Sequence, residues 1–180
     1  MSLDNVIAEV SGFYKVIALH PLRRTGGVSF DSVPMEHIGS VEGIDRVVHH
    51  SGAISPQPVG SIERPWYMHH AQDDNLLVLA GVRHVDIYTP KAGEILSFSV
   101  SADKVVLNGE VLHDGPAMLV WPKGVFHRVE SCSDVGSSTI NFAHRYKGFD
   151  IKTEFNIYDV DIKTGEYSVI RAGHLDQPND

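Results

Sequence analysis

The chain has 180 residues, of which 42% are hydrophobic and 21% are charged. These values are typical of globular proteins and exclude a disordered or collagen-like chain. The formal net charge of −8 excludes a uniformly basic nucleic-acid-binding surface. No apolar run reaches the roughly 18 residues that a membrane span needs. The length suits one domain, so we expect residues 1–180 to form a single domain.

The cysteine and histidine content bears on location and chemistry. The single cysteine, Cys132, cannot form an internal disulfide, and no basic segment followed by an apolar one opens the chain. Both observations predict a cytoplasmic location without a signal peptide. The eleven histidines are an unusually high number. Because imidazole is a common metal ligand and proton carrier, they point to a metal site or an acid–base site.

The elements expected along the chain are mostly short strands. A short helix is expected from Asp4 to about Val10, and a second helical turn over 32–37. Segment 51–65, with three prolines and two glycines, is typical of a loop or an irregular edge. Apolar or alternating runs bounded by turn residues predict strands over 13–19, 75–80, 82–88, 94–100, 104–107, 117–121, 125–130, 138–146, 153–160 and 166–171.

Two turns are specific enough to predict hairpins. Asn108-Gly109 separates two short apolar segments, and both residues suit the positive φ angles of a type I′ turn. Lys163-Thr164-Gly165 separates the last two predicted strands in the same way. About ten strands in one domain imply a sandwich, a jelly roll or a closed barrel.

Two segments carry candidate chemistry. The first runs from Tyr67 to Asp74 (YMHHAQDD) and places two histidines and two carboxylates at the start of a strand. Imidazole and carboxylate together suit Fe, Mn, Zn or Ni, although such a run can also be a solvated loop. The second is the turn Trp121-Pro122-Lys123-Gly124, after which His127 shares a strand face with Val125 and Val129. A histidine on that apolar face needs a partner, either within the core or as a ligand.

Together these segments resemble the cupin superfamily between about residues 60 and 131. The end of its first motif is matched by Asp74 and, after six residues, Gly81. Its second motif is matched in order by Gly115, Pro122, Gly124 and His127. The resemblance implies an all-β fold, a cupin-type double-stranded β-helix or jelly-roll barrel, here with an N-terminal extension.

The sequence departs from the first cupin motif, which has two histidines one residue apart. A four-residue gap before Asp74 makes His69 the second histidine and puts Tyr67 in the first slot. A three-residue gap selects His70 instead and puts Met68 there. Neighbouring strand residues face opposite ways, so one of the two histidines is expected to point inward. The resemblance thus implies one divalent transition metal held by Asp74, His127 and His69, His70 or both.

The implied ligand set resembles the facial triad of two histidines and one carboxylate, which leaves positions for water, O₂ or substrate. We expect chemistry of the oxygenase or isomerase type on a small polar molecule, such as a hydroxy acid, a keto acid or a sugar derivative, with Tyr67 or His50 carrying a proton. The alternative is a non-catalytic small-molecule-binding cupin without a functional metal site. Arginines 46, 64, 83 and 145 are candidates for an anionic substrate group, and their spacing selects none of them.

A prediction about assembly follows from strand parity. If Asp74 faces the barrel interior, Leu77 and Leu79 face outward, because their parity is opposite. Two apolar residues on an outer face need cover from the strand at 13–19 or from a second subunit. We therefore expect a homodimer formed by sheet-to-sheet packing.

Overall fold

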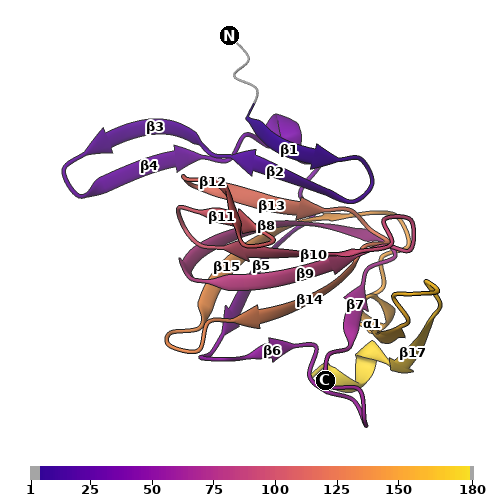
Figure 1. Ribbon diagram of the computed structural model, residues 1–180. Coiled ribbons are helices and arrows are strands. Elements are labelled where there is room, and N and C mark those ends of the chain that lie inside the picture. Colours follow the sequence, from indigo (N-terminus) through magenta and orange to yellow (C-terminus); the bar gives the residue numbers. More distant parts are fainter. Residues whose placement is uncertain (1–4, 179–180) are drawn as a thin grey trace.

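The computed structural model describes residues 5–178 and shows two β-sheets packed face to face (Figure 1). The first sheet has the strand order β1 (Val6–Val10), β2 (Tyr14–Ala18), β13 (Ala117–Trp121), β8 (Gln72–Gly81), β15 (Ser137–Arg145) and β5 (Gly43–His49). The second sheet has the order β12 (Glu110–His113), β11 (Val105–Leu107), β10 (Ile95–Val100), β9 (Arg83–Tyr88), β14 (Phe126–Ser131), β7 (Trp66–Met68), β16 (Ile157–Val160) and β17 (Tyr167–Arg171).

The remaining elements are short. Strand β6 (Ile54–Ser55) pairs with β14, and β3 (His20–Thr25) pairs with β4 (Val28–Ser32) in a separate hairpin that projects from the body (Figure 1). The helical elements are η1 (Met35–His37), α1 (Ile151–Glu154) and η2 (Gly173–Asp176). Among the described residues, no helix is long and apolar enough to cross a membrane.

The core lies between the two sheets and follows the period of two. On β8 of the first sheet, Leu76 and Val78 point inward, and on β9 of the second sheet Val85 and Ile87 meet them. Tyr88 and Phe126 lie on the opposite face of the second sheet, in a smaller cluster with Trp66. On β8, β9, β14 and β15, a polar residue that is an even number of positions from an inward apolar residue therefore also points into the space between the sheets.

Nine of the ten strands expected from the sequence are present, and the tenth, expected over 153–160, is a strand only over Ile157–Val160, because 153–154 belong to helix α1. The predicted hairpin at Asn108-Gly109 is also confirmed, since both residues have positive φ angles, 49° and 86°. The turn at 163–165 joins β16 to β17 as predicted. The expected turn over 32–37 forms as the 3₁₀ helix Met35–His37.

The prediction of a helix near the N-terminus is wrong for the part of it that the structure describes, residues 5–10. Val6–Val10 forms strand β1, which pairs antiparallel with β2 through a tight turn at Gly12, whose φ is 75°. Asp4, the expected helix cap, lies outside the described residues. The run VIAEV contains three β-branched residues, and pairing with β2 decides their conformation.

The outward orientation of Leu77 and Leu79 is confirmed, since Leu76 and Val78 are buried in the core and Leu79 is 54% exposed. The strand at 13–19 does not cover these residues, because β2 lies within the same sheet, beside β13. On part of the outer face, residues 37–39 line a pocket together with Asn75 and Val120. Leu79 is left uncovered by the described chain.

Candidate active site

Three strands bring the candidate residues to one end of the space between the sheets. Along β7 and the residue after it, Tyr67 and His69 share the inward parity, while Met68 packs in the second cluster. Asp74 points inward from β8, and His127 points inward from β14. The turn before β14 is tied to the same place, because the amide of Gly124 donates to the carbonyl of His69 at 2.8 Å.

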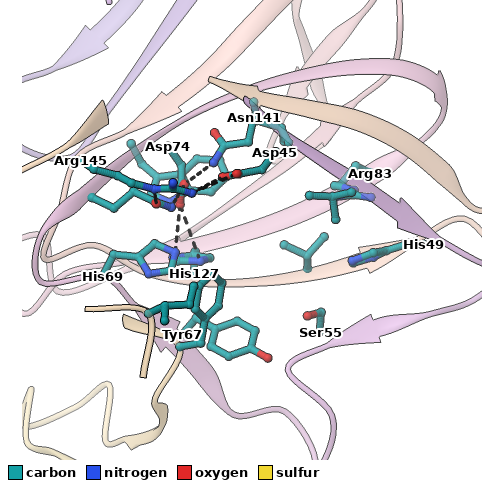
Figure 2. Close-up of a pocket in the computed structure, with 17 residues that line it drawn as sticks. Asp45, His49, Ser55, Tyr67, His69, Asp74, Arg83, His127, Asn141 and Arg145 are labelled. Atoms are coloured by element: carbon teal, nitrogen blue, oxygen red, sulfur yellow. Dashed lines mark hydrogen bonds and ion pairs between the residues drawn. The ribbon is translucent and has the colours of Figure 1, made fainter. Parts of the chain in front are cut away.

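Three donor atoms converge at this point. Nε2 of His69 lies 3.3 Å from Oδ2 of Asp74, and Nε2 of His127 lies 4.0 Å from the same oxygen. One ligand atom from each of the three residues lies within 4.8 Å of the others, and all three residues are buried. Figure 2 shows the three side chains meeting from separate strands.

Backbone carbonyls orient both imidazoles. Nδ1 of His69 donates to the carbonyl of Glu154 at 2.7 Å, and Nδ1 of His127 donates to the carbonyl of Val125 at 3.3 Å. A carbonyl only accepts, so Nδ1 carries the hydrogen in each ring. In the neutral rings the Nε2 lone pairs then face Oδ2 of Asp74, which is the arrangement that outer hydrogen bonds impose on metal-binding histidines.

Asp74 is itself fixed by two amide side chains. Its Oδ1 accepts from Nε2 of Gln72 at 2.8 Å and from Nδ2 of Asn141 at 2.7 Å. Gln72 is held in turn by Nε of Arg145 at 3.1 Å, and Arg145 pairs with both carboxylate oxygens of Asp45 at 3.0 and 3.2 Å. This arrangement leaves Oδ2 of Asp74 directed at the two histidines.

The electrostatics of the cluster separate the two histidines. Burial disfavours a charged His69, but the adjacent Asp74 carboxylate and its hydrogen bond outweigh this, and the pKa of His69 is raised above its ordinary value. Burial and the neighbouring His69 lower the pKa of His127 to about 4. Burial would raise the pKa of Asp74, but the two histidines and Gln72 lower it to about 2. At neutral pH Asp74 is ionised and His127 is neutral.

The cluster opens into a cavity of about 240 Å³. Tyr67 contributes to its wall, with its ring centroid 6.0 Å from that of His127. Trp121 is 4% exposed, lines the cavity, and its Nε1 has no hydrogen-bond partner among the described residues. Helix α1 and the residue after it close one side through Ile151 and Phe155.

Two of the predicted site residues are not in the cluster. His70 is exposed and its Nε2 bonds to the hydroxyl of Tyr158 at 2.9 Å, because it has the opposite parity to His69. The structure therefore favours the register that uses His69. His50 is exposed in the turn after β5 and does not line the cavity, so its position gives no support to the proton-carrying role expected for it. Its neighbour His49 points inward instead.

Sequence reasoning missed the residues that position Asp74 and those that line the far end of the cavity. Gln72 shares the parity of Asp74, a signal that was present in the sequence. Asn141 and Arg145 lie four residues apart on the predicted strand 138–146, so they share one face and carried the same signal. His49 was missed because β5 was not predicted as a strand, so no parity was assigned to it.

Comparison with protein-family models and with curated proteins gives no match. Solved structures do match. A dTDP sugar isomerase from Desulfovibrio desulfuricans is 15% identical, with a TM-score of 0.56 over 79% of this chain and 83% of that one. A dTDP-4-dehydrorhamnose 3,5-epimerase from Sulfolobus tokodaii is 14% identical, with a TM-score of 0.54 over 80% and 76%. The fold is a cupin jelly roll.

A third similar structure is QdtA, a sugar 3,4-ketoisomerase from Thermoanaerobacterium thermosaccharolyticum, in complex with TDP. It is 12% identical, with a TM-score of 0.52 over 78% of this chain and 85% of that one. At these identities the comparison establishes the cupin fold and transfers no residue roles. The predicted all-β cupin jelly roll is thereby confirmed.

The donor set of this site fits a divalent transition metal. Two neutral imidazole nitrogens and one carboxylate oxygen suit Fe, Mn, Zn or Ni, and the outer hydrogen bonds from Gln72 and Asn141 are of the kind that orient metal ligands. His69, Asp74 and His127 would hold the ion. Three protein donors would leave part of its coordination shell to other molecules.

Proposed function

We propose that the protein is a metal-dependent enzyme that performs isomerase-type chemistry on a small polar molecule carrying a carbonyl or hydroxyl group. The observation that carries this proposal is the convergence of three acceptor atoms, Nε2 of His69, Nε2 of His127 and Oδ2 of Asp74. Buried lone pairs that face one another repel, so the site requires a positive charge among them. A divalent cation supplies that charge to all three atoms at once.

The metal and the chain have separate tasks in this proposal. A bound divalent ion polarises a substrate oxygen as a Lewis acid. Tyr67 lies beside His127, and burial raises the pKa of its hydroxyl, which stays protonated at neutral pH and is available as a proton donor. Trp121 lines the cavity, and its buried Nε1–H, which has no hydrogen-bond partner among the described residues, is a second candidate donor to a substrate oxygen. The apolar walls around Leu76 and Val129 exclude water from the reacting atoms.

Several substrate classes are compatible with this site. The similar solved structures are named as isomerases or epimerases of dTDP sugars, which supports isomerase-type chemistry on a sugar derivative. Hydroxy acids and keto acids also offer a carbonyl or hydroxyl oxygen. An oxygenase reaction would use the same donors, and consumption of O₂ by the iron-loaded protein would distinguish it.

A second candidate function is metal-free proton transfer by the pair His69 and Asp74. The specific observation is the 3.3 Å separation of Nε2 and Oδ2 together with the raised pKa of His69. In this version a proton on His69 provides the positive charge, and the imidazole exchanges it with substrate. His127 then has no ligand role.

The test is proton exchange in D₂O. The protein is loaded with Fe(II), Mn(II), Zn(II) or Ni(II) and incubated with TDP-4-keto-6-deoxyglucose and with a series of hydroxy and keto acids. Isomerase chemistry exchanges a hydrogen next to a carbonyl, which nuclear magnetic resonance detects. We expect exchange only with metal, and its loss in His127→Ala. Equal exchange after treatment with a chelator would favour the His69–Asp74 pair, and no exchange in any arm would favour a binding protein without catalysis.

We also propose that the protein acts as a cytoplasmic homodimer. Leu79 is 54% exposed on the outer face of the first sheet, and Ile44 is 67% exposed on β5 of the same sheet. Burial of such residues favours association of two copies through that face. The unpaired Cys132 is compatible with a reducing compartment.

A further inference from the structure

Arg83 sits at the far end of the cavity as a buried cation without a carboxylate partner. It shares the inward face of β9 with Val85 and Ile87, and it is 3% exposed. Its Nε and Nη2 donate to the hydroxyl of Ser137 at 2.9 and 2.8 Å. No described residue bonds its Nη1, and no described carboxylate lies within 4.0 Å of the guanidinium. A buried guanidinium is costly unless an anion compensates it.

The charge of the other arginine that lines the cavity is compensated by a carboxylate. Arg145 also lines the cavity, but Asp45 binds it through both carboxylate oxygens, at 3.0 and 3.2 Å, and the ring of Phe149 lies 4.6 Å from its Cζ. The sequence offered both residues as anion partners without choosing between them. Of the two described arginines that line the cavity, Arg83 is therefore the one without a carboxylate partner.

His49 adds a second unpartnered group at the same end. Its Nδ1 is buried and has no hydrogen-bond partner among the described residues, and its side chain lines the cavity. Figure 2 places His49 and Arg83 together, across the cavity from His69 and Asp74. Burial and the charge of Arg83 lower the pKa of His49 to about 4, so His49 is neutral at physiological pH. The net charge of this end is therefore that of Arg83 alone.

We infer that Arg83 and His49 form the anion subsite of the substrate pocket, and that they bind the carboxylate of a small monocarboxylic acid. This inference rests on the proposed function for the reacting end. One uncompensated guanidinium matches one carboxylate charge, whereas a phosphate dianion would remain partly uncompensated. The cavity of about 240 Å³ is smaller than the roughly 300–1,000 Å³ of drug-sized ligand sites. It suits a small acid better than a whole sugar nucleotide.

The strand geometry places the acid and the reacting group at different ends of the ligand. Asp74 is bonded to Asn141, and Arg83 is bonded to Ser137, four residues away on the same strand β15. Four residues of strand correspond to about 13 Å between Cα atoms. Val47 and Val129 form apolar wall between the two ends. The ligand is therefore an acid whose keto or hydroxyl group is separated from the carboxylate by several methylene groups, and not a 2-oxo acid that would chelate a metal through both groups.

The test uses the chelator-treated, metal-free protein, so that it does not depend on the metal. The probes are 4-oxopentanoate, 5-oxohexanoate and 6-oxoheptanoate, each beside its neutral primary amide, and inorganic phosphate. Isothermal titration is expected to show at least one acid binding roughly thirty-fold or more tightly than its amide. Arg83→Met should remove this preference. The control variant Arg128→Met should keep it, because Arg128 does not line the cavity and pairs with Asp86 at 2.9 Å.

Stability gives an independent readout without any ligand. Arg83→Met removes an uncompensated buried charge and should leave the denaturation midpoint unchanged or raise it, whereas Arg145→Met strips Asp45 of its partner and should lower it. The inference is overturned if acids and amides bind equally, if no acid of the series binds, if phosphate binds in preference to the acids, or if Arg83→Met retains the acid preference. A preserved acid preference in a protein that binds no metal would reject the metal proposal and keep the anion subsite.

Discussion

Nε2 of His69 lies 3.3 Å from Oδ2 of Asp74, while Nδ1 of the same ring is bound to the carbonyl of Glu154. The Nδ1 edge of the imidazole is thus held by the backbone, and the Nε2 edge is directed at a buried carboxylate. His127 approaches the same oxygen at 4.0 Å from a strand that reaches the site 58 residues later in the chain. A cation shared by these three residues is the simplest account of their arrangement.

The first prediction concerns His127 as a ligand. His127→Ala should reduce the metal content of the purified protein to a small fraction of the wild-type value, because only two donors remain. His84→Ala is the control, since His84 is exposed on the opposite face of β9 and bonds to Ser99. Metal content is measured by inductively coupled plasma mass spectrometry. Equal metal in the two variants would reject the assignment of His127.

The second prediction concerns pH. His69 has a raised pKa in the metal-free protein, so a proton must leave its Nε2 before a metal binds, whereas His127, with a pKa of about 4, is already neutral. Apparent affinity for Zn(II) should be constant well above the pKa of His69 and should fall about tenfold per pH unit below it, with one proton released. Competition with a chelator between pH 5.5 and 8.5 measures this slope. An affinity that is independent of pH over that range would count against His69.

The third prediction concerns the residues that orient Asp74. Gln72→Met keeps the size of the side chain but removes the hydrogen bond to Oδ1. Metal affinity should fall by about 10–100-fold, the usual effect of losing an outer hydrogen bond to a ligand. Gln57→Met is a matched control, because Gln57 is exposed and bonds only to the backbone of Ile54. Unchanged affinity in Gln72→Met would show that Asn141 alone positions the carboxylate.

Ten strands of the two large sheets were predicted, because each of them is an apolar or alternating run that ends near a turn residue. Strand β1 was expected as a helix, and the short strands β6 and β7 were not predicted. Strands β3, β4 and β5 were missed for different reasons. In the largely exposed hairpin, β3 has no apolar alternation and β4 alternates only over Val28 and Phe30. Strand β5 has Ile44, Arg46 and Val48 on the outside and Asp45, Val47 and His49 on the inside, so neither of its faces is uniformly apolar.

The site was predictable where strand parity could be applied. His69, Asp74 and His127 lie on strands with clear registers, and the structure brings them together. His50 was chosen over His49 because no strand register was available for that segment. The sequence could not show that Arg83 lacks a carboxylate partner while Arg145 has one. That difference depends on the pairing of Asp45 with Arg145, a contact between strands β5 and β15.

A fourth prediction tests the close approach of the backbone at Gly81 to that at Gly136. Gly81 has a φ of 72°, and a Cβ there would lie 1.9 Å from the carbonyl oxygen of Gly136. Gly81→Ala should therefore destabilise the protein well beyond the about 1–3 kcal/mol of an ordinary overpacked site. Gly93→Ala is the control, with a φ of 71° but no atom within 4 Å, and should cost only about 1–2 kcal/mol. Urea denaturation measures both, and equal losses would contradict the close approach.

A fifth prediction concerns assembly. If the outer face of the first sheet forms a homodimer, Leu79→Lys should shift the protein to a monomer in sedimentation experiments at micromolar concentration. Val111→Lys is the matched control, because Val111 is 59% exposed on β12, at the edge of the other sheet. A wild-type protein that sediments as a monomer would reject the dimer without affecting the fold.

We propose above that His69, Asp74 and His127 form a metal site. Titration of the chelator-treated protein with Co(II), followed by visible absorption spectroscopy, tests it most directly, since Co(II) reports its ligands through its absorption bands. The account predicts saturation at one equivalent in the wild type, with the bands absent in Asp74→Asn and His127→Ala and present in His84→Ala. Failure of the wild type to bind Co(II), or identical spectra in all four proteins, would contradict it.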